Sequence, residues 1–404
     1  YILGKFKEAV KEFNKIIADN PRNYPAYYQK GRALFDLGNA TDAIEAYDRV
    51  IEGNSHFAEA YFHKGIALLE LSRSEEAIVE FDNTLEIDPQ FADAHYYRGV
   101  AQANLGKNTD AVITFDRVIN MKPAFAPAFY SKGLAQYSLG IYQGSIESFD
   151  HALELDPGMA DAALKKAIAL HDLGRYEESL AACDKALELR ADFIGAFYQK
   201  GKTLADLEQY TAAVSAFDRT IELDKNNSRA YFEKGLVLAH LGRYLEAVAS
   251  FDRLLDIQPS YAPAFFHKGR ALASVEMYDE AVMAYNIALE ITPDDAEVLY
   301  EKGIALAHRD NHEEAIAAFE NAAKIDPLKA KIHYQRGLSL AALGHHKDAV
   351  QAFTKTLEID PRFTDALYHN GLSLAELGEF DDAITALSRT IEVSPKIANA
   401  HLIR

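Results

Sequence analysis

A strict period of 34 residues runs through this chain and limits what it can fold into. The stretch from Ala26 to Glu52 reads AYYQKGRALFDLGNATDAIEAYDRVIE and returns 34 residues later as AYFHKGIALLELSRSEEAIVEFDNTLE. One small residue marks each period, and nothing is inserted or deleted between successive marks. These residues are Gly31, Gly65, Gly99, Gly133, Ala167, Gly201, Gly235, Gly269, Gly303, Gly337 and Gly371. Such a chain is a tandem array of one small unit rather than a single globular core.

Each unit has the pattern of two helices. Numbering the unit from 1 to 34 with the small residue at position 8 gives eleven full repeats, from residue 24 to residue 397. In the first repeat, Tyr27, Gly31 and Leu34 follow a helical spacing that stops at Gly38, a residue suited to the left-handed turn that ends a helix. A second helical face follows, with Thr41 as its expected N-cap, and a proline at position 32 of eight repeats closes the unit.

Small and large residues alternate at the expected crossing of the two helices. Position 8 is Gly or Ala, position 20 is Ala in nine repeats, and position 24 is aromatic in nine repeats. We expect the ring at position 24, such as Tyr47 or Phe81, to fill the space that the small residues leave.

The repeat at 160–193 departs most from this pattern. It carries Ala163, Leu164, Ala167, Ser179, Cys183 and Ala191 where other repeats differ. Cys183 takes the place of the position-24 ring and is therefore interpreted as a small core residue, not as a nucleophile. Because several large groups are missing together, we expect this repeat to be the softest of the array and to act as a hinge.

With an aromatic residue at position 4, Gly at 8, Leu at 11, Ala at 20, an aromatic at 24 and Pro at 32, the whole chain resembles a tetratricopeptide repeat (TPR) array. The resemblance implies an all-α fold, a right-handed superhelical solenoid of helix hairpins whose first helices line a concave groove. Residues 1–23 match a second helix alone, 24–397 match eleven full repeats, and 398–404 match the start of a further first helix. Since natural arrays end in polar capping units, we expect the sequence to be a piece of a longer chain.

One departure from the family is systematic. Position 7 is Lys or Arg in ten repeats, where the family usually has Leu, and position 25 is acidic in eight. Lys132 and Asp116 are examples. Either each base contacts an acid along the array, or each Lys lays its methylene groups over a helix seam and keeps its charge in water.

Composition narrows the range of partners. The formal net charge of −19 disfavours nucleic acid and anionic lipid surfaces. The single cysteine, Cys183, excludes an intramolecular disulfide and a cysteine-rich zinc site. No apolar run reaches the roughly 20 residues that span a bilayer. We expect no nucleic-acid partner, no membrane insertion and a cytoplasmic location.

The strongest sign of chemistry is a cluster in one turn. His308, Asp310, His312 and Glu313 could together hold zinc. However, His312 occupies position 17, which is Tyr in repeats such as the one with Tyr278, so the structural interpretation is favoured. We predict that the chain is not an enzyme and has no catalytic residue, no metal site and no cofactor.

The resemblance implies that positions 2, 5, 6, 9, 12 and 13 face the groove. Position 5 is aromatic in ten repeats. These rings would suit an extended peptide or a partner helix, or would pack chiefly against the neighbouring first helix. Basic residues at position 9 could grip acidic ligand groups, or pair along their own helix with Asp36 and Asp206. The predicted groove residues are Tyr28, Phe62, Tyr96, Tyr130, Tyr198, Phe232, Phe266, Tyr300, Tyr334, Tyr368, Arg32, Lys202 and Arg270.

Three functions remain open from the sequence. The first is a non-catalytic protein–protein interaction scaffold that binds a peptide or partner protein in the concave groove. The second is a structural element that self-associates end to end through its exposed stacking faces. The third is the substrate-selecting arm of a larger enzyme. The first is favoured because the groove positions vary between repeats while the core positions do not.

Overall fold

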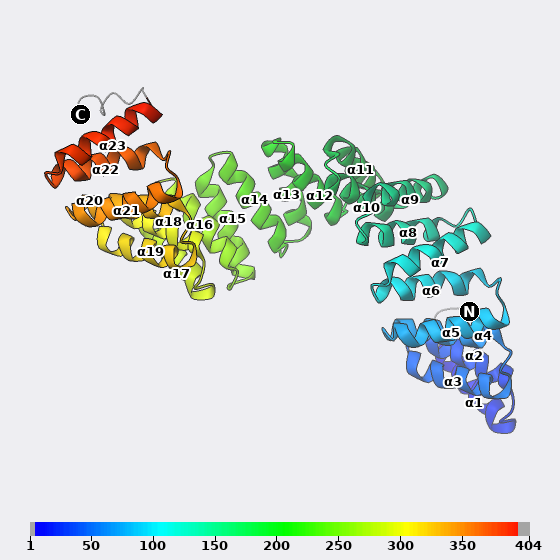
Figure 1. Cartoon of the computed structure of the whole chain (residues 1–404). Helices are drawn as coiled ribbons and strands as arrows, with labels where there is room; N and C mark the ends of the chain where they lie inside the picture. The colour runs from blue at the N-terminus through cyan, green and yellow to red at the C-terminus, as the bar shows by residue number, and fades with distance from the viewer. Residues whose placement is uncertain (1–4, 395–404) are drawn as a thin grey trace. The chain divides into compact units, whose positions relative to one another are not determined.

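The computed structural model describes residues 5–394, and every regular element in that range is an α-helix (Figure 1). The helices form two compact units, divided between Asp206 and Leu207. The first unit holds α1 (Phe6–Asp19), α2 (Tyr24–Asp36), α3 (Ala40–Gly53), α4 (Ala58–Glu70), α5 (Ser74–Ile87), α6 (Ala92–Asn104), α7 (Asn108–Met121), α8 (Ala126–Ser138), α9 (Tyr142–Leu155), α10 (Ala160–Asp172), α11 (Tyr176–Leu189) and α12 (Ile194–Asp206). The second unit holds α13 (Tyr210–Leu223), α14 (Ser228–His240), α15 (Tyr244–Ile257), α16 (Ala262–Ala273), α17 (Tyr278–Ile291), α18 (Ala296–His308), α19 (His312–Ile325), α20 (Ala330–Ala342), α21 (His346–Ile359), α22 (Thr364–Glu376) and α23 (Phe380–Val393).

Each unit is a stack of helix hairpins. Within a hairpin an even-numbered helix packs on the helix that follows it, as α2 packs on α3 and α14 on α15. The second helix then packs on the first helix of the next hairpin, as α3 does on α4. The prediction of an all-α solenoid of hairpins is confirmed. The division into eleven full repeats and two partial ones stays a prediction, and its segment 398–404 lies outside the described residues.

The turn inside every hairpin requires a left-handed residue at position 15. Gly38 has φ +80°, and six further glycines at this position have φ between +72° and +80°. In the remaining four hairpins Ser72, Glu208, Glu276 and Asp310 hold φ between 57° and 61°. A residue with a Cβ is strained in this conformation, so the turn is imposed by the packing of the two helices as well as by glycine.

The expected N-cap of the first hairpin's second helix is wrong by two residues. The helix begins at Ala40, and Asn39 is its N-cap, whose side chain accepts a hydrogen bond from the backbone N–H of Asp42 at 3.3 Å. Thr41 lies in the first turn instead. The tight turn at Gly38 leaves only one residue before the helix starts, which is why the cap falls on Asn39.

The two helices of a hairpin cross where position 8 meets position 24. A Cβ atom added to Gly31 would lie 2.6 Å from a ring carbon of Tyr47, and the same contact recurs at 2.5–2.7 Å in seven other hairpins. The rings, including Phe81, are fully buried. The repeat at 160–193 changes both partners together, since Ala167 faces the small and fully buried Cys183. Glycine at position 8 is therefore required by the ring at position 24.

The same repeat leaves a hollow beside its short position-4 residue, Ala163. Its volume is about 250 Å³, and its lining includes Leu153, Leu170 and Ala182. Most other repeats carry a ring or a leucine at position 4. The missing side-chain volume is thus not fully replaced, and the softness of this repeat stays a prediction.

Ion pairs join successive hairpins at the expected positions 25 and 7. Lys132 pairs with Asp116 at 2.7 Å, across from a second helix to the next first helix. The eight pairs are Asp48–Lys64, Asp82–Arg98, Asp116–Lys132, Asp150–Lys166, Asp184–Lys200, Asp218–Lys234, Asp252–Lys268 and Glu320–Arg336. The Lys132 side chain is only 22 % exposed and that of Asp116 is 49 % exposed. The first interpretation, a base that contacts an acid at each step, therefore matches the structure, and the low exposure of Lys132 shows that much of its side chain is also covered.

Candidate functional site

The first helices line the inner side of each unit. Successive first helices contact one another, as α2 contacts α4 in the first unit and α14 contacts α16 in the second. Successive second helices make no comparable contact within residues 5–394. Because the first helices are closer together, each unit curves with its first helices on the inside.

The predicted position-5 rings lie on these first helices and pack into the array. Phe62 is the most buried, at 8 % exposure. Its ring contacts Phe81 in its own hairpin, Phe91 in the following turn and Tyr97 on the next first helix. The half-buried rings are Tyr28, Tyr96, Tyr130, Tyr198, Phe232, Phe266, Tyr300, Tyr334 and Tyr368. Each ring is thus a packing group that leaves only part of its surface for a ligand.

A second set of rings, at position 6, lies flat on the position-24 ring of the preceding repeat. His63 stacks on Tyr47 with an interplanar angle of 23°, and His267 stacks on Phe251 at 26°. Burial, helped by the charge of Arg32, lowers the pKa of His63 to about 4. Burial, helped by Arg270, lowers the pKa of His267 to about 4 as well. These stacks were not predicted from the sequence, although a ring at position 6 directly after one at position 5 was a visible signal.

The three predicted basic residues at position 9 differ in their surroundings. Arg32 and Lys202 are half-buried and Arg270 is exposed. The predicted Lys202–Asp206 pair is wrong, because Asp206 meets His171 instead and Lys202 forms no ion pair within the described part of the chain.

Arg270 carries a charge that no acid neutralises directly. Its guanidinium carbon lies 5.7 Å from the centroid of the Phe266 ring. It forms no ion pair with any residue in the range 5–394. An exposed cation without an acid partner on the inner surface is available to a ligand.

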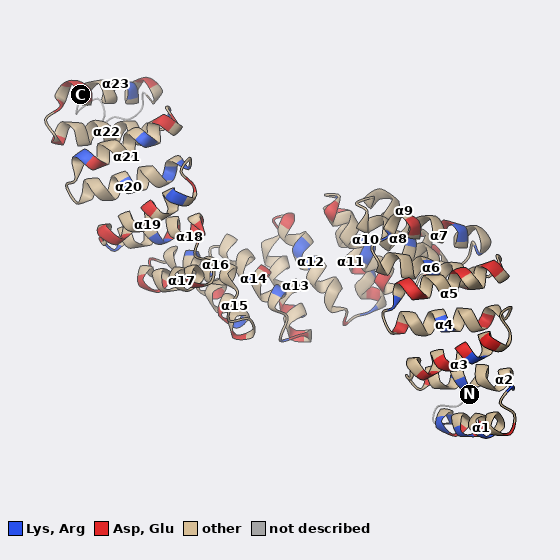
Figure 2. Cartoon of the chain, turned by 60° about the horizontal axis from the view of Figure 1, so that its bottom comes forward, with Lys and Arg blue, Asp and Glu red and all other residues tan. Residues whose placement is uncertain are grey.

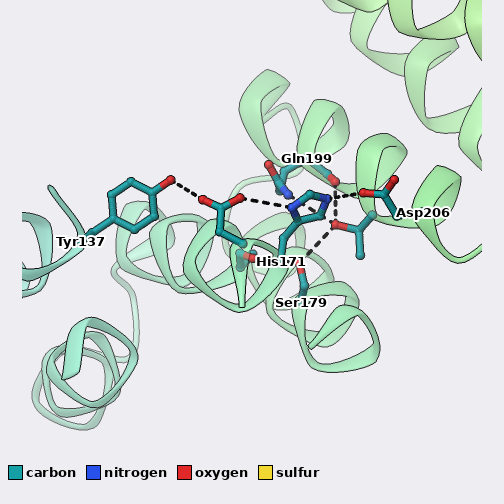
Figure 3. Close-up of polar contacts among 8 residues, drawn as sticks. Tyr137, His171, Ser179, Gln199 and Asp206 are labelled. Carbon is teal, nitrogen blue, oxygen red and sulfur yellow. Dashed lines mark hydrogen bonds and ion pairs between the residues drawn. The ribbon is translucent and has the colours of Figure 1, made fainter. Parts of the chain in front are cut away.

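A chain of polar contacts crosses three first helices of the first unit (Figure 3). The Tyr137 hydroxyl donates a hydrogen bond to Asp172. His171 Nδ1 lies 3.3 Å from Asp172 Oδ1, and His171 Nε2 lies 2.8 Å from Asp206 Oδ2. Burial and the bond to Asp172 raise the pKa of Tyr137, so its hydroxyl keeps its proton at neutral pH. The chain of contacts therefore ties α8, α10 and α12 together.

These polar contacts were not anticipated, but a signal existed. Tyr137 and His171 occupy position 12, which is Ala in most other repeats, and each is followed 35 residues later by an acid at position 13 of the next repeat. Ser179, drawn beside these residues in Figure 3, donates a hydrogen bond to the carbonyl oxygen of Ala167 at 2.8 Å and is fully buried. Its hydroxyl thus holds α11 against α10.

The second unit has a hollow on its inner surface, lined by residues of α14, α15 and α16. Ala239 stands at position 12 there, and the space beside it measures about 290 Å³. Three rings line it: Tyr244, Phe251 and His267. The remaining lining residues are Leu236, Ala239, His240, Arg270, Ala271 and Ser274. The hollow therefore combines aromatic walls with the exposed guanidinium group of Arg270.

The turn that could have held zinc is occupied by other contacts. The His308 ring stacks on Tyr278 with a centroid distance of 4.9 Å and an interplanar angle of 4°. His312 Nε2 lies 3.9 Å from Asp310 Oδ1. Within residues 5–394 no group of three or more His, Cys, Asp or Glu side chains is arranged to hold a metal ion.

The charged residues of the described helices are mixed in sign. Acidic and basic residues are interspersed along the helices of both units (Figure 2). Acids recur in the first turn of second helices, for example Glu246 in α15, where they complement the helix dipole. Among the described helices, none is long and apolar enough to cross a bilayer.

Several solved structures resemble part or most of this chain. They include YrrB, a TPR protein with an unusual peptide-binding site, at 25% identity over 47% of this chain and 97% of that chain, with a TM-score of 0.43. Yeast Tom70 has 16% identity over 94% of each chain, with a TM-score of 0.39. A tetratricopeptide repeat protein from Parabacteroides merdae has 16% identity over 62% of this chain and 98% of that chain, with a TM-score of 0.46. No curated protein matches the chain.

The sequence model of one family covers almost all of the chain. The tetratricopeptide repeat model matches residues 3–56, 28–90, 62–128, 130–192, 198–262, 266–330 and 334–396. The chain therefore belongs to the tetratricopeptide repeat family, whose members generally mediate protein–protein interactions as non-catalytic scaffolds.

Proposed function

We propose that this chain is a protein-interaction scaffold that binds a peptide or a partner protein along the inner, first-helix surface. One observation carries the proposal: an inner position such as position 12 differs more between repeats than core positions such as 8 and 20 do. Position 12, for example, is Phe35, Tyr137, His171 or Ala239 in different repeats, and all four side chains are half-buried. A surface whose residues vary on a recurrent frame is what partner recognition needs.

The remaining inner positions support the same function. Position 9 is apolar and half-buried at Ile66, Val100 and Leu134, but basic at Arg270. The half-buried apolar side chains beside the rings give a partner apolar area to contact. A basic residue such as Arg270 can fix the orientation of the partner by binding one of its acidic groups. The ten position-5 rings and the bases Arg32 and Lys202 belong to this surface, and we expect them to shape it more than to bind directly.

The test is affinity capture from a lysate of the source cells with a variant that obstructs the inner surface. Ala103→Tyr and Ala239→Tyr together place rings at position 12 of two first helices, copying Tyr137. The matched control is Ala181→Tyr with Ala249→Tyr, which adds the same two rings to exposed sites on second helices. Circular dichroism should show the same helix content for all three proteins.

We expect quantitative mass spectrometry to show proteins that bind the wild type and the control but not the inner-surface variant. Partners lost only from the control would place recognition on the second helices. An unchanged set of proteins in all three captures would contradict inner-surface binding.

A further inference from the structure

The hollow on α14 and α16 has the chemistry of a specific subsite. We propose that it receives a large apolar side chain of an extended partner segment, and that Arg270 binds the carboxylate of an acidic residue next to that side chain. The inference rests on the proposed function, because it needs a partner segment on the inner surface.

The shape of the hollow suits one large side chain. Its volume of about 290 Å³ is at the lower end of ligand pockets, which start at roughly 300 Å³. Tyr244 and His267 supply partly exposed ring surfaces, the Phe251 ring on which His267 stacks is fully buried, and Ala239 has only a small side chain. Rings favour aromatic or large aliphatic partners through stacking and burial of apolar area. Position 12 is Ala here, as in most repeats, whereas Tyr137 and His171 occupy that position in two repeats of the first unit.

The charge at the hollow favours a carboxylate. Arg270 is exposed and forms no ion pair within the described residues. Guanidinium groups bind carboxylates in a bidentate manner that ammonium groups cannot copy. Arg270 thus places a local positive charge on a chain whose formal net charge is −19.

The neighbouring titratable groups leave that cation available. Glu301 is half-buried on α18, and burial raises its pKa while Arg270 opposes the shift, so the two groups interact only through space. Glu297 acts on His267 in the same indirect way. His240 Nδ1 lies 2.9 Å from the carbonyl oxygen of Leu236, and its ring stacks on Tyr210. Neither acid lies within ion-pair distance of Arg270, which leaves the guanidinium free for a ligand carboxylate.

The experiment starts from a phage-displayed library of random peptides selected against the whole chain. Enriched peptides are synthesised, and their dissociation constants are measured by fluorescence anisotropy. Two variants probe the subsite: Ala239→Tyr fills the hollow, and Arg270→Gln removes the charge. Ala249→Tyr is the matched control, because it adds the same ring at an exposed position on the second helix α15 of the same unit, outside the inner surface.

We expect the enriched peptides to share an aromatic or large aliphatic residue next to Asp or Glu. Their affinity should fall about tenfold or more for Ala239→Tyr and for Arg270→Gln, and stay unchanged for Ala249→Tyr. Changing the acidic residue of the peptide to its amide should weaken the binding of the peptide to the wild-type protein. The same change should not weaken its binding to Arg270→Gln any further, because a direct contact is lost only once.

The other outcomes each overturn the inference. Peptides that bind Ala239→Tyr as well as the wild type would exclude the hollow, and peptides without a shared acid would exclude the role of Arg270. Failure to enrich any peptide would exclude both. In all three cases, partner capture that remains sensitive to the paired Ala103→Tyr and Ala239→Tyr variant would leave the proposed scaffold function standing.

Discussion

At the scale of single residues, the closest approach in each hairpin is between position 8 and position 24. A Cβ atom added to Gly99 would lie 2.7 Å from a ring carbon of Phe115, so the ring already fills the space that a side chain would need. In the repeat at 160–193 both residues change, to Ala167 and Cys183. The pair therefore behaves as one unit of packing, and either residue changed alone should be harmful.

Cys183→Phe alone should destabilise its hairpin by about 1–3 kcal/mol, because Ala167 Cβ occupies the space that the ring needs. Ala167→Gly alone should cost about 1 kcal/mol through helix propensity. The double variant should be destabilised much less than the sum of the two single variants, since it recreates the Gly–Phe pair of the other hairpins. Amide exchange of α10 and α11 measures the local opening free energy. Strictly additive effects would show that the two positions are independent.

The stacked histidines predict an acid-sensitive stability. Burial, with the charge of Arg32, lowers the pKa of His63 from 6.5 to about 4. The unfolded chain therefore takes up a proton near pH 6.5, while the folded chain does not until pH is near 4. Stability from this residue is full above pH 6.5 and falls by about 3 kcal/mol as pH drops to 4.

His63→Tyr should remove that part of the acid loss. Tyr97 already occupies position 6 of the next repeat and stacks on Phe81 at 25°, so the replacement has a native precedent. Urea unfolding at pH 7 and at pH 4.5 compares the two proteins, and the difference between them isolates His63 from the carboxylates. Equal acid losses in both proteins would rule out a neutral, buried His63.

At the scale of helices, the ion pairs between positions 25 and 7 tie each second helix to the next first helix. The pairs are partly exposed, so each should contribute no more than about 1 kcal/mol. The lysine at one step lacks its acid: Asn286 holds position 25 before Lys302, and Lys302 forms no ion pair among residues 5–394.

Asp116→Asn with Asp150→Asn should therefore lower stability by about 0.4–2 kcal/mol in total, and Asn286→Asp should raise it by about 0.2–1 kcal/mol. Both effects should shrink in high salt. Thermal unfolding followed by circular dichroism at low and high ionic strength measures them. No change from the double variant would mean that the lysine stems stabilise the seam without their charges.

The repeat at 160–193 should exchange its amide hydrogens faster than the repeats on either side. It combines a hollow of about 250 Å³ with the loss of a core ring at Cys183. Against this, the contacts from Tyr137 to Asp206 tie its first helix to both neighbours. Exchange in 160–193 that is slower than in the flanking repeats would show that these polar contacts outweigh the missing volume.

At the scale of the whole molecule, the 34-residue period alone was enough to predict the fold, because each repeat packs against repeats of the same pattern. Residue patterns that recur in nearly every hairpin predicted two features: the contact between positions 8 and 24, and the ion pairs between positions 25 and 7, such as Asp116–Lys132. The contacts of the inner surface could not be predicted in this way, since they depend on residues that differ from the repeat pattern. The contact between His171 and Asp206, for example, arises from single positions whose partners lie one repeat away, which no periodic pattern specifies.

The position-5 rings show the same limit. Their recurrence in ten repeats suggested a contact ladder, but recurrence is also what packing requires. Phe62 contacts rings on three sides, and a sequence pattern cannot distinguish a recurrent packing ring from a ligand-binding one. Positions that differ between repeats are the better guide to the binding surface.

The most direct test of inner-surface recognition is site-specific photo-cross-linking in a lysate of the source cells. A photoreactive amino acid is placed at Ala239 on α14 in one protein and at the exposed Ala249 on α15 in another. Recognition by the first helices predicts covalent protein adducts from position 239 that are absent or much weaker from position 249. Adducts of equal yield from both positions, or from position 249 alone, would contradict the account.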